Sequence, residues 1–379
     1  MPGYELIGSE EQAAVDRIFQ EGGVLFAHGF HARRQGIYHV REFEAAFAEK
    51  FHVAHAQAVS SGTAALKVAL KAVGVKPGDE VITQALNFIA TVEAILDVGA
   101  VPIITNVDSS LNMDATELKA KISAKTKAII PVHMLGFAAN IKSICQVAQE
   151  YNIPVIEDNC ESIGATFNGD FLGTIGDIGV FSFDFGKAIT TGEGGMIVTN
   201  DSKYAKYVRE YQDHGHENNP NLPRGKDTRT IYGFNYRMTE LQGAIGKVQL
   251  GKLDYIIQEN KARYLALENS LGDSVQTRTL FSECSPLYDT FMFYIDNPSV
   301  QEKVIHYLHQ SGVGTKNIPD AVEWHFAGYW NHALASEQIA NLKPSADLLA
   351  KYVAVPINLS RSVKNYSRIG EQLCELVKR

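Results

Sequence analysis

The sequence predicts an α/β protein with a mostly parallel central sheet, and two observations lead to this fold class. Between about His55 and Asn200, apolar or β-branched runs of about five residues alternate with helical patterns of ten or more residues, which is typical of βαβ units. After about Asn235, longer amphipathic helices and a few short strands follow, which indicates a second, smaller α/β domain. The 379 residues, 45% hydrophobic and 21% charged, have the composition of an ordinary globular protein.

The expected elements of the first part follow from the short apolar runs and the helical patterns between them. Strands are expected at 56–60, 80–84, 101–105, 127–132 and 153–158, and helices at 63–73, 88–98 and 141–151. The Pro77-Gly78 pair marks the turn before the second of these strands. Two further strands, at 179–184 and 195–200, are joined by a glycine-rich loop.

The second part of the chain is more helical. Residues 238–271 form either one long amphipathic helix or two helices in series, and a strand at 290–295, a helix at 300–310 and a terminal helix follow. The polar, proline-containing segment 213–228 is either a mobile linker or a loop that becomes ordered on a partner.

Composition excludes several classes of protein. The net charge of −8 and the absence of a long basic block argue against nucleic-acid binding. The opening MPGYELIGSEEQ does not have the pattern of a signal peptide. The longest apolar stretch, at 128–139, contains Pro131 and His133 and is too short to span a membrane. Four scattered cysteines without a CxxC pair indicate a reducing compartment, without a disulfide framework or zinc site, so we expect a cytoplasmic protein that does not bind a membrane or a structural metal.

Three local features point to chemistry, although each has a simpler interpretation. Lys187 lies in GVFSFDFGKAITTGEGG, in the loop after a strand, but a single lysine near glycines is usually a solvated loop residue. Asp158 follows the apolar strand IPVIED, where a carboxylate could hold a cationic ring nitrogen or simply cap a helix. The small residues from Ser60 to Thr63 precede a helix, whose N-terminus either binds a phosphate or is capped in the ordinary way.

Together these features indicate a cofactor. A phosphate cup, a carboxylate for a ring nitrogen and a loop lysine are the groups that pyridoxal phosphate requires, because the lysine forms a Schiff base and the acid keeps the pyridinium protonated. A dinucleotide oxidoreductase is disfavoured, because SSGTAAL is not a GxGxxG motif.

The sequence also resembles a known family. SSGTAAL, the ED of VIEDN, FSFDFGKAITTGEGGM and GFNYRMTELQGAIGKVQLGKLD are similar to segments of the DegT/DnrJ/EryC1/StrS sugar aminotransferases. The resemblance implies a pyridoxal-phosphate enzyme of fold type I, like aspartate aminotransferase, with a mixed, mostly parallel seven-stranded sheet. It further implies an N-terminal arm or helix at 1–25, a large cofactor-binding domain at 26–245 and a small C-terminal α/β domain at 246–379. MPGYEL, Asp184, the DHGH run and Trp324-His325 resemble the branch of 8-amino-3,8-dideoxy-manno-octulosonate transaminases.

The resemblance also implies roles for individual residues. Lys187 would form the Schiff base and move the proton, and Asp158 would pair with the pyridine nitrogen. The remaining assignments are phosphate binding by Gly62, Thr63 and Ser182, stacking on the pyridine ring by Phe88, and contact with the phosphate of the neighbouring subunit's cofactor by Asn235. The last of these requires a homodimer with shared active sites. Trp324 and His325 would lie in the substrate pocket, although core packing is the alternative.

Glu161 departs from the family pattern. Many members have glutamine at this place in EDxxQ, where the amide bonds the cofactor's phenolic oxygen, so we expect the Glu161 carboxylate to be protonated or to turn away. We also expect burial or a nearby cation to lower the pKa of Lys187, so that its neutral amine can act as a base.

The function implied by the resemblance is transfer of an amino group from L-glutamate to a keto or aldehydo sugar during surface-polysaccharide biosynthesis (lipopolysaccharide or O-antigen). The acceptor would be 8-oxo-3,8-dideoxy-octulosonate, with a nucleotide-diphosphate-linked keto-sugar as the alternative. A non-catalytic sugar-binding or scaffold protein is the alternative from another class. Anionic groups of the acceptor would need cationic partners, for which the candidates are Arg33, Arg34, Arg41, Arg224, Arg229 and Arg237.

Overall fold

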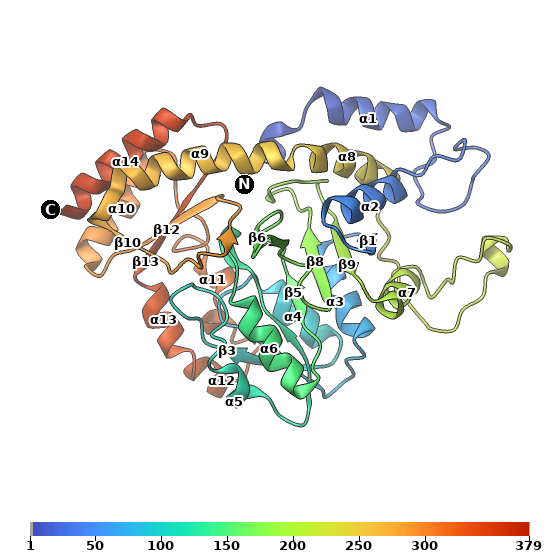
Figure 1. Ribbon diagram of the computed structural model, residues 1–379, viewed down its shortest axis with the longest axis horizontal. Helices are drawn as coiled ribbons and strands as arrows, with labels where there is room; N and C mark the ends of the chain where they lie inside the picture. Colours follow the sequence, from blue (N-terminus) through green and yellow to red (C-terminus); the bar gives the residue numbers. More distant parts are fainter. Residues whose placement is uncertain (1–2, 379) are drawn as a thin grey trace.

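A computed structural model describes residues 3–378 (Figure 1). Seven strands form its central sheet. The strands are β1 (His55–Val59), β2 (Glu80–Gln84), β3 (Val101–Thr105), β4 (Thr126–Ile130), β5 (Ile156–Asp158), β8 (Ile178–Ser182) and β9 (Gly195–Thr199). They form two hydrogen-bonded groups, β1-β9-β8-β5 and β3-β2-β4. Parallel bridges from Ile129 to Val155 and from Val132 to Asp158 join the two groups through β4 and β5.

The direction of the strands matches the predicted mostly parallel sheet. β5 and β8 are parallel, as are β2 with β3 and β2 with β4. Within residues 3–378, β9 is the one strand of this sheet that runs against the others, because it is antiparallel to both β1 and β8. The predicted seven-stranded sheet is therefore confirmed.

Helices cover both faces of this sheet because side chains alternate along each strand. Ile178 and Val180 of β8 face a core that includes α3 (Gly62–Ala72), whereas Phe181 faces a second core beneath α2 (His39–Lys50). The other helices of this part of the chain are α4 (Ala90–Asp97), α5 (Leu118–Lys121), α6 (Ile141–Tyr151) and α7 (Ser202–Tyr211).

The segment 238–271 is two helices in series, α8 (Glu240–Gly251) and α9 (Leu253–Leu271), which run along the top of Figure 1. α8 begins with a capping box in which Thr239 and Gln242 bond each other's backbone. α9 contributes Leu253 and Ile256 to the core of the main sheet, and its later turns pack on a separate core and on α14 (Val363–Lys378). One helix therefore stabilises both parts of the chain.

The C-terminal part has its own antiparallel sheet, with the order β10-β12-β13. Its elements are β10 (Gln276–Thr277), β12 (Thr290–Tyr294), α10 (Pro298–Gln310), α11 (Val322–His325), α12 (Ser336–Ala340), α13 (Lys343–Leu349) and β13 (Tyr352–Pro356). A third small sheet consists of β6 (Thr166–Phe167), β7 (Asp170–Phe171) and β11 (Cys284–Ser285). This arrangement agrees with a smaller C-terminal α/β unit, and the boundaries proposed at 25/26 and 245/246 stay predictions.

The N-terminal segment consists of a 3₁₀ turn at Gly3–Leu6 and α1 (Ser9–Gln20), which packs on α8. The segment 213–228 is held by its own contacts: Arg224 donates to both carboxylate oxygens of Asp213, and Asp227 accepts from the backbone of Asn218 and Asn219. All four cysteines are free. Within residues 3–378, every helix is too short or too polar to cross a membrane.

Candidate active site

A cavity of about 430 Å³ lies where β5 and β8 end and α3 begins. Parallel strands bring their carboxyl ends to one edge of a sheet, which is where α/β proteins bind ligands. Most of the residues singled out in the sequence line this cavity: Gly62, Thr63, Phe88, Asp158, Glu161, Ser182, Lys187 and His325.

Asp158 is the last residue of β5 and is 4% exposed. Its Oδ2 accepts a hydrogen bond of 2.8 Å from the hydroxyl of Thr91 on α4, and its Oδ1 accepts one of 3.2 Å from the backbone N–H of Cys160. Asp158 ends a strand and caps no helix of the described chain, so the helix-cap interpretation is wrong. These two bonds fix the carboxylate at the wall of the cavity.

The N-terminus of α3 forms another wall. Ser61 is the N-cap and accepts from the N–H of Ala64 at 3.0 Å, so ordinary capping is present here. The N–H groups of Gly62 and Thr63, in the first turn, have no acceptor within the helix and lie beside the cavity. A Cβ on Gly62 would lie 2.8 Å from the Cβ of Ser182, so only glycine lets the helix come this close to the end of β8. The helix N-terminus and Ser182 thus form a concave site suited to an anion.

Lys187 is not a solvated loop residue, because its side chain is only 15% exposed. The loop after β8 places it: the N–H of Lys187 donates to the carbonyl of Asp184 at 3.0 Å. The N-terminal turn closes over the same loop, since the N–H of Gly3 donates to the carbonyl of Lys187 and Tyr4 stacks on Phe185 with ring centroids 5.3 Å apart.

Glu161 faces Lys187 across the cavity. Its Oε1 lies 3.5 Å from the Nζ of Lys187, and its side chain is 6% exposed. Burial alone would raise the pKa of Glu161, but the positive charges of Lys187, Lys316 and His325 outweigh it and lower that pKa to about 2. Neither expected state occurs in this structure: the carboxylate is ionised, and it points at the lysine.

The expectation that the pKa of Lys187 is lowered is also wrong for this structure. Burial alone would lower that pKa, but the negative charge of Glu161 outweighs it, with further contributions from Cys160 and Asp158, and the net shift is upward. The amine is therefore an ammonium until something changes its surroundings.

Two further residues of this site went unnoticed in the sequence. Thr91 bonds Asp158, as described above, and it lies on α4 where a buried threonine gives no distinctive signal. Asn317 comes from the C-terminal part of the chain, and its Nδ2 lies 3.5 Å from Oε2 of Glu161. Its φ is +62°, a conformation that asparagine tolerates better than most residues. This preference of asparagine is the one feature of the sequence that could have pointed to Asn317.

His325 and Phe88 lie together at the mouth of the cavity, with ring centroids 5.5 Å apart. The backbone holds them there, because the N–H groups of Asn87 and Ile89 donate to the carbonyls of His325 and Trp324. Phe88 is 44% exposed.

Trp324 and Asn235 lie outside the lining of this cavity. Trp324 is 61% exposed, so the core-packing interpretation is wrong for it. Asn235 is exposed and forms an antiparallel bridge with Asp213.

The charges of the cavity are unbalanced. Carboxylates of Asp158, Glu161, Asp184 and Glu193 line it, against the cationic or titratable groups of Lys187 and His325. None of the six candidate arginines lines it. Arg224 and Arg237 pair with Asp213, and Arg34 pairs with Glu240.

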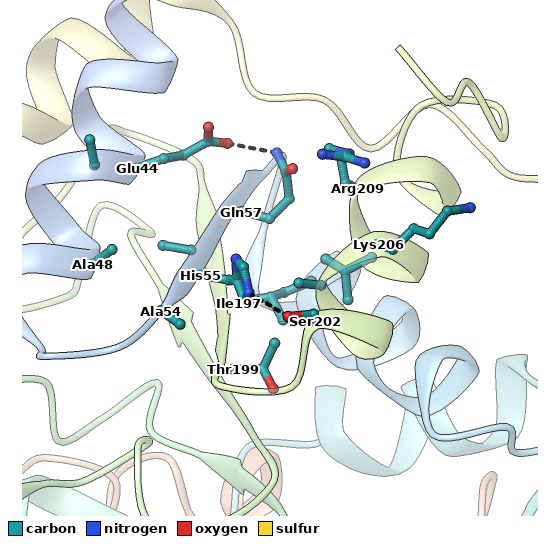
Figure 2. Close-up of a pocket in the computed structure, with 14 residues that line it drawn as sticks. Glu44, Ala48, Ala54, His55, Gln57, Ile197, Thr199, Ser202, Lys206 and Arg209 are labelled. Atoms are coloured by element: carbon teal, nitrogen blue, oxygen red, sulfur yellow. Dashed lines mark hydrogen bonds between the residues drawn. The ribbon is translucent and has the colours of Figure 1, made fainter. Parts of the chain in front are cut away.

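Another cavity, of about 340 Å³, lies between α2, β1 and α7 (Figure 2). Gln57 donates to Glu44 there at 2.6 Å, and His55 lies 3.3 Å from the hydroxyl of Ser202. It contains none of the residues singled out in the sequence.

Known proteins are similar to this chain over most of its length. The sequence pattern of the DegT/DnrJ/EryC1/StrS aminotransferase family matches residues 27–373. A GDP-perosamine synthase of Caulobacter vibrioides is 45% identical over 214 residues, which are 56% of this chain and 56% of that relative. The lipopolysaccharide biosynthesis protein RfbH of Salmonella typhimurium is 30% identical over 308 residues, 72% of this chain and 70% of that protein. The match to the synthase thus spans little more than half of that protein's length.

A solved structure of an aminotransferase from Psychrobacter cryohalolentis is similar to the whole fold. It has a TM-score of 0.86 and 26% sequence identity, over 98% of this chain and 97% of that chain. This likeness confirms the predicted fold type I architecture.

Proposed function

The chain belongs to the DegT/DnrJ/EryC1/StrS aminotransferase family, and on that premise we propose that it is a pyridoxal-phosphate enzyme that transfers the amino group of L-glutamate to a keto or aldehydo sugar. One observation carries the proposal: Lys187, Asp158 and the N-terminus of α3 converge on one cavity. A protein that only bound sugars would have no use for a buried lysine beside a buried acid.

The residues of the cavity fit the cofactor. Gly62, Thr63 and Ser182 would hold its phosphate, because they form the concave site at the start of α3. Asp158, held by Thr91, would bond the protonated ring nitrogen. Phe88 would cover the ring, and Lys187 would bond its aldehyde carbon.

The chain's own groups would then carry the proton transfers. When bound, pyridoxal phosphate supplies an electron sink for the α-carbon of the donor. Displaced from the cofactor, Lys187 would remove the α-proton of glutamate and deliver a proton in the amination of the acceptor. Asp158 would keep the ring nitrogen protonated throughout. Lys187 also favours transamination over dehydration, since family members that act as dehydratases have histidine in its place.

We propose both a class of acceptor and a specific acceptor compound. For the class, a sugar of surface polysaccharides, support comes from RfbH, a lipopolysaccharide biosynthesis protein. For the compound, we propose 8-oxo-3,8-dideoxy-octulosonate, on the resemblance of MPGYEL, Asp184, DHGH and Trp324-His325. A nucleotide-linked keto-sugar is the second candidate, because the relative that is 45% identical is named for a GDP-sugar.

Absorbance spectroscopy tests the cofactor and the donor together. The purified protein with pyridoxal phosphate is expected to show a visible band that L-glutamate shifts to the shorter wavelength of the pyridoxamine form. Adding a 3,8-dideoxy-8-oxo sugar acid to that form should restore the original band, whereas a GDP- or UDP-linked keto-sugar should not. Restoration by the nucleotide sugar alone would assign the second candidate, and no band at all would contradict the enzyme assignment.

We also propose that the active protein is a homodimer with shared active sites. The donor and the acceptor are both anionic, yet the cavity of one chain has more carboxylates than cations, so a partner must supply further cations. Asn235 lies outside its own cavity, between the aromatic residues Phe234 and Tyr236. Phe234 and Tyr232 are 49% and 66% exposed, and such a group of aromatic side chains is typical of an interface.

A Tyr232→Glu variant is expected to weaken this dimer by about tenfold or more in dissociation constant, because a charge replaces an aromatic side chain at the interface. Sedimentation velocity over a range of concentrations measures the effect. Tyr151→Glu is the matched control, because Tyr151 is 47% exposed on α6 and lies away from this group. A wild-type monomer, or equal dimer affinity in both variants, would contradict the proposal.

A further inference from the structure

Glu161 is held on two sides inside the cavity. Its Oε1 lies 3.5 Å from the Nζ of Lys187, and its Oε2 lies 3.5 Å from the Nδ2 of Asn317. Its own backbone is fixed, because its carbonyl accepts a bond of 3.1 Å from the N–H of Gly136. The contact with Asn317 crosses from the C-terminal part of the chain, so both parts of the protein determine where this carboxylate points.

The other charged groups near Glu161 and Lys187 have bonding partners of their own. Lys316 is the next cation, but its Nζ donates to Asp289 at 2.8 Å and to the hydroxyl of Thr290 at 2.9 Å. His325 already contacts the carbonyl of Ala321 through Nδ1 at 2.8 Å. On the lysine side, Asp158 is held by Thr91, and Asp184 accepts from the N–H of Gly186. Within residues 3–378, Lys187 forms one ion pair, with Glu161.

The carboxylate of Glu161 differs chemically from the glutamine amide that many similar sequences have at this position. A glutamine could donate a hydrogen bond but could not balance the charge of an ammonium. A buried amine that loses its hydration favours the neutral form, whereas a carboxylate at 3.5 Å favours the ammonium. Lys187 therefore has a counter-charge at its side whenever its nitrogen is free.

We propose that Glu161 is a positioning residue that holds the Nζ of Lys187 in the cavity as an ammonium in the cofactor-free protein, with Asn317 fixing the direction of the carboxylate. The inference deepens the proposed function, since it assigns to Glu161 the control of when the lysine becomes a nucleophile towards the cofactor. In the wild type the neutral amine becomes available only at higher pH. Removal of the carboxylate makes it available at lower pH.

The reactivity of Lys187 in the cofactor-free, full-length protein tests the proposed role of Glu161 without any substrate. The rate at which acetic anhydride modifies Lys187, read by mass spectrometry of its peptide, follows the fraction of neutral amine. In Glu161→Gln the midpoint of the pH profile is expected to move down by at least about one pH unit, which is the effect of removing one opposite charge at this range. Glu193→Gln is the matched control, because Glu193 lines the same cavity and forms no recorded contact with Lys187; its profile should match the wild type.

Two further variants separate this role from a structural one. Glu161→Asp keeps the charge and should keep most of the wild-type profile. Asn317→Ala removes the contact that fixes the Glu161 carboxylate, so it should lower the midpoint of the pH profile by part of the shift expected for Glu161→Gln. It replaces Glu161→Gln if that variant fails to fold. An unchanged midpoint in folded Glu161→Gln, or in Asn317→Ala when it replaces that variant, would overturn the inference. Because neither glutamate nor a sugar is present, failure of the proposed transamination would leave these results unaffected.

Discussion

Replacement of Lys187 by alanine is expected to abolish the visible band of the bound cofactor and to lower the rate of amino transfer by at least about 10²- to 10⁴-fold. That range is the usual contribution of a positioned acid–base group, and the variant loses the covalent attachment as well. Lys187 is the lysine that lines the cavity, with its side chain 15% exposed and its Nζ beside Glu161. Absorbance spectra and single-turnover kinetics with L-glutamate measure both effects.

The control for this variant is Lys203→Ala, which removes an exposed lysine from the first turn of α7 and should leave band and rate unchanged. Circular dichroism must accompany the spectra, because Lys187→Ala removes the nearest cation from the buried Glu161 and so raises the pKa of that carboxyl. A folded Lys187→Ala protein with an unchanged band would show that another lysine holds the cofactor. A variant without the band that still supported the biological role would instead favour a scaffold protein.

The sequence predicted the main sheet well, because its strands carry short apolar or β-branched runs and most of them alternate with helices along the chain. β8 shows why: Ile178 and Val180 face one core and Phe181 the other, so a fully buried strand needs apolar residues on both faces. The strands β6, β7, β10, β11 and β13 were not predicted. The first four have only two residues each, which is too short for any periodicity, whereas β13 is the five-residue apolar run YVAVP at Tyr352–Pro356.

The candidate site was predictable to the extent that it depends on sheet geometry. Asp158 and Ser182 end neighbouring parallel strands, so residues far apart in the sequence had to meet. Asn317 could not be predicted in this way, because 156 residues separate it from Glu161 and the packing of the C-terminal part decides the contact. The charge of Glu161 was visible in the sequence, but its partner was not, since the direction of a side chain depends on all its neighbours. For the same reason the upward shift in the pKa of Lys187 became apparent only in the structure.

An Asp158→Asn variant is expected to bind the cofactor and to react about 10- to 100-fold more slowly with L-glutamate. Asparagine has the same shape, and its one side-chain oxygen can take the place of Oδ2, which accepts from the hydroxyl of Thr91 in the wild type, so the fold should be kept. What is lost is the negative charge that would keep the ring nitrogen protonated. Hydrogen bonds to charged groups contribute about 1.5–3 kcal/mol, which corresponds to this range of rates.

Stopped-flow spectroscopy of the reaction with glutamate measures this rate apart from acceptor binding. Asp184→Asn is the matched control, because Asp184 is another carboxylate of the same cavity whose contacts are to the backbone of its own loop, through the N–H of Gly186. The Asp184→Asn variant should react with glutamate less than about tenfold more slowly than the wild type, because this substitution leaves the wall formed by β5 and α4 unchanged. Equal losses in the two variants would mean that the total negative charge of the cavity, and not a bond at the end of β5, governs the reaction. A loss confined to Asp158→Asn would place the ring nitrogen at this residue.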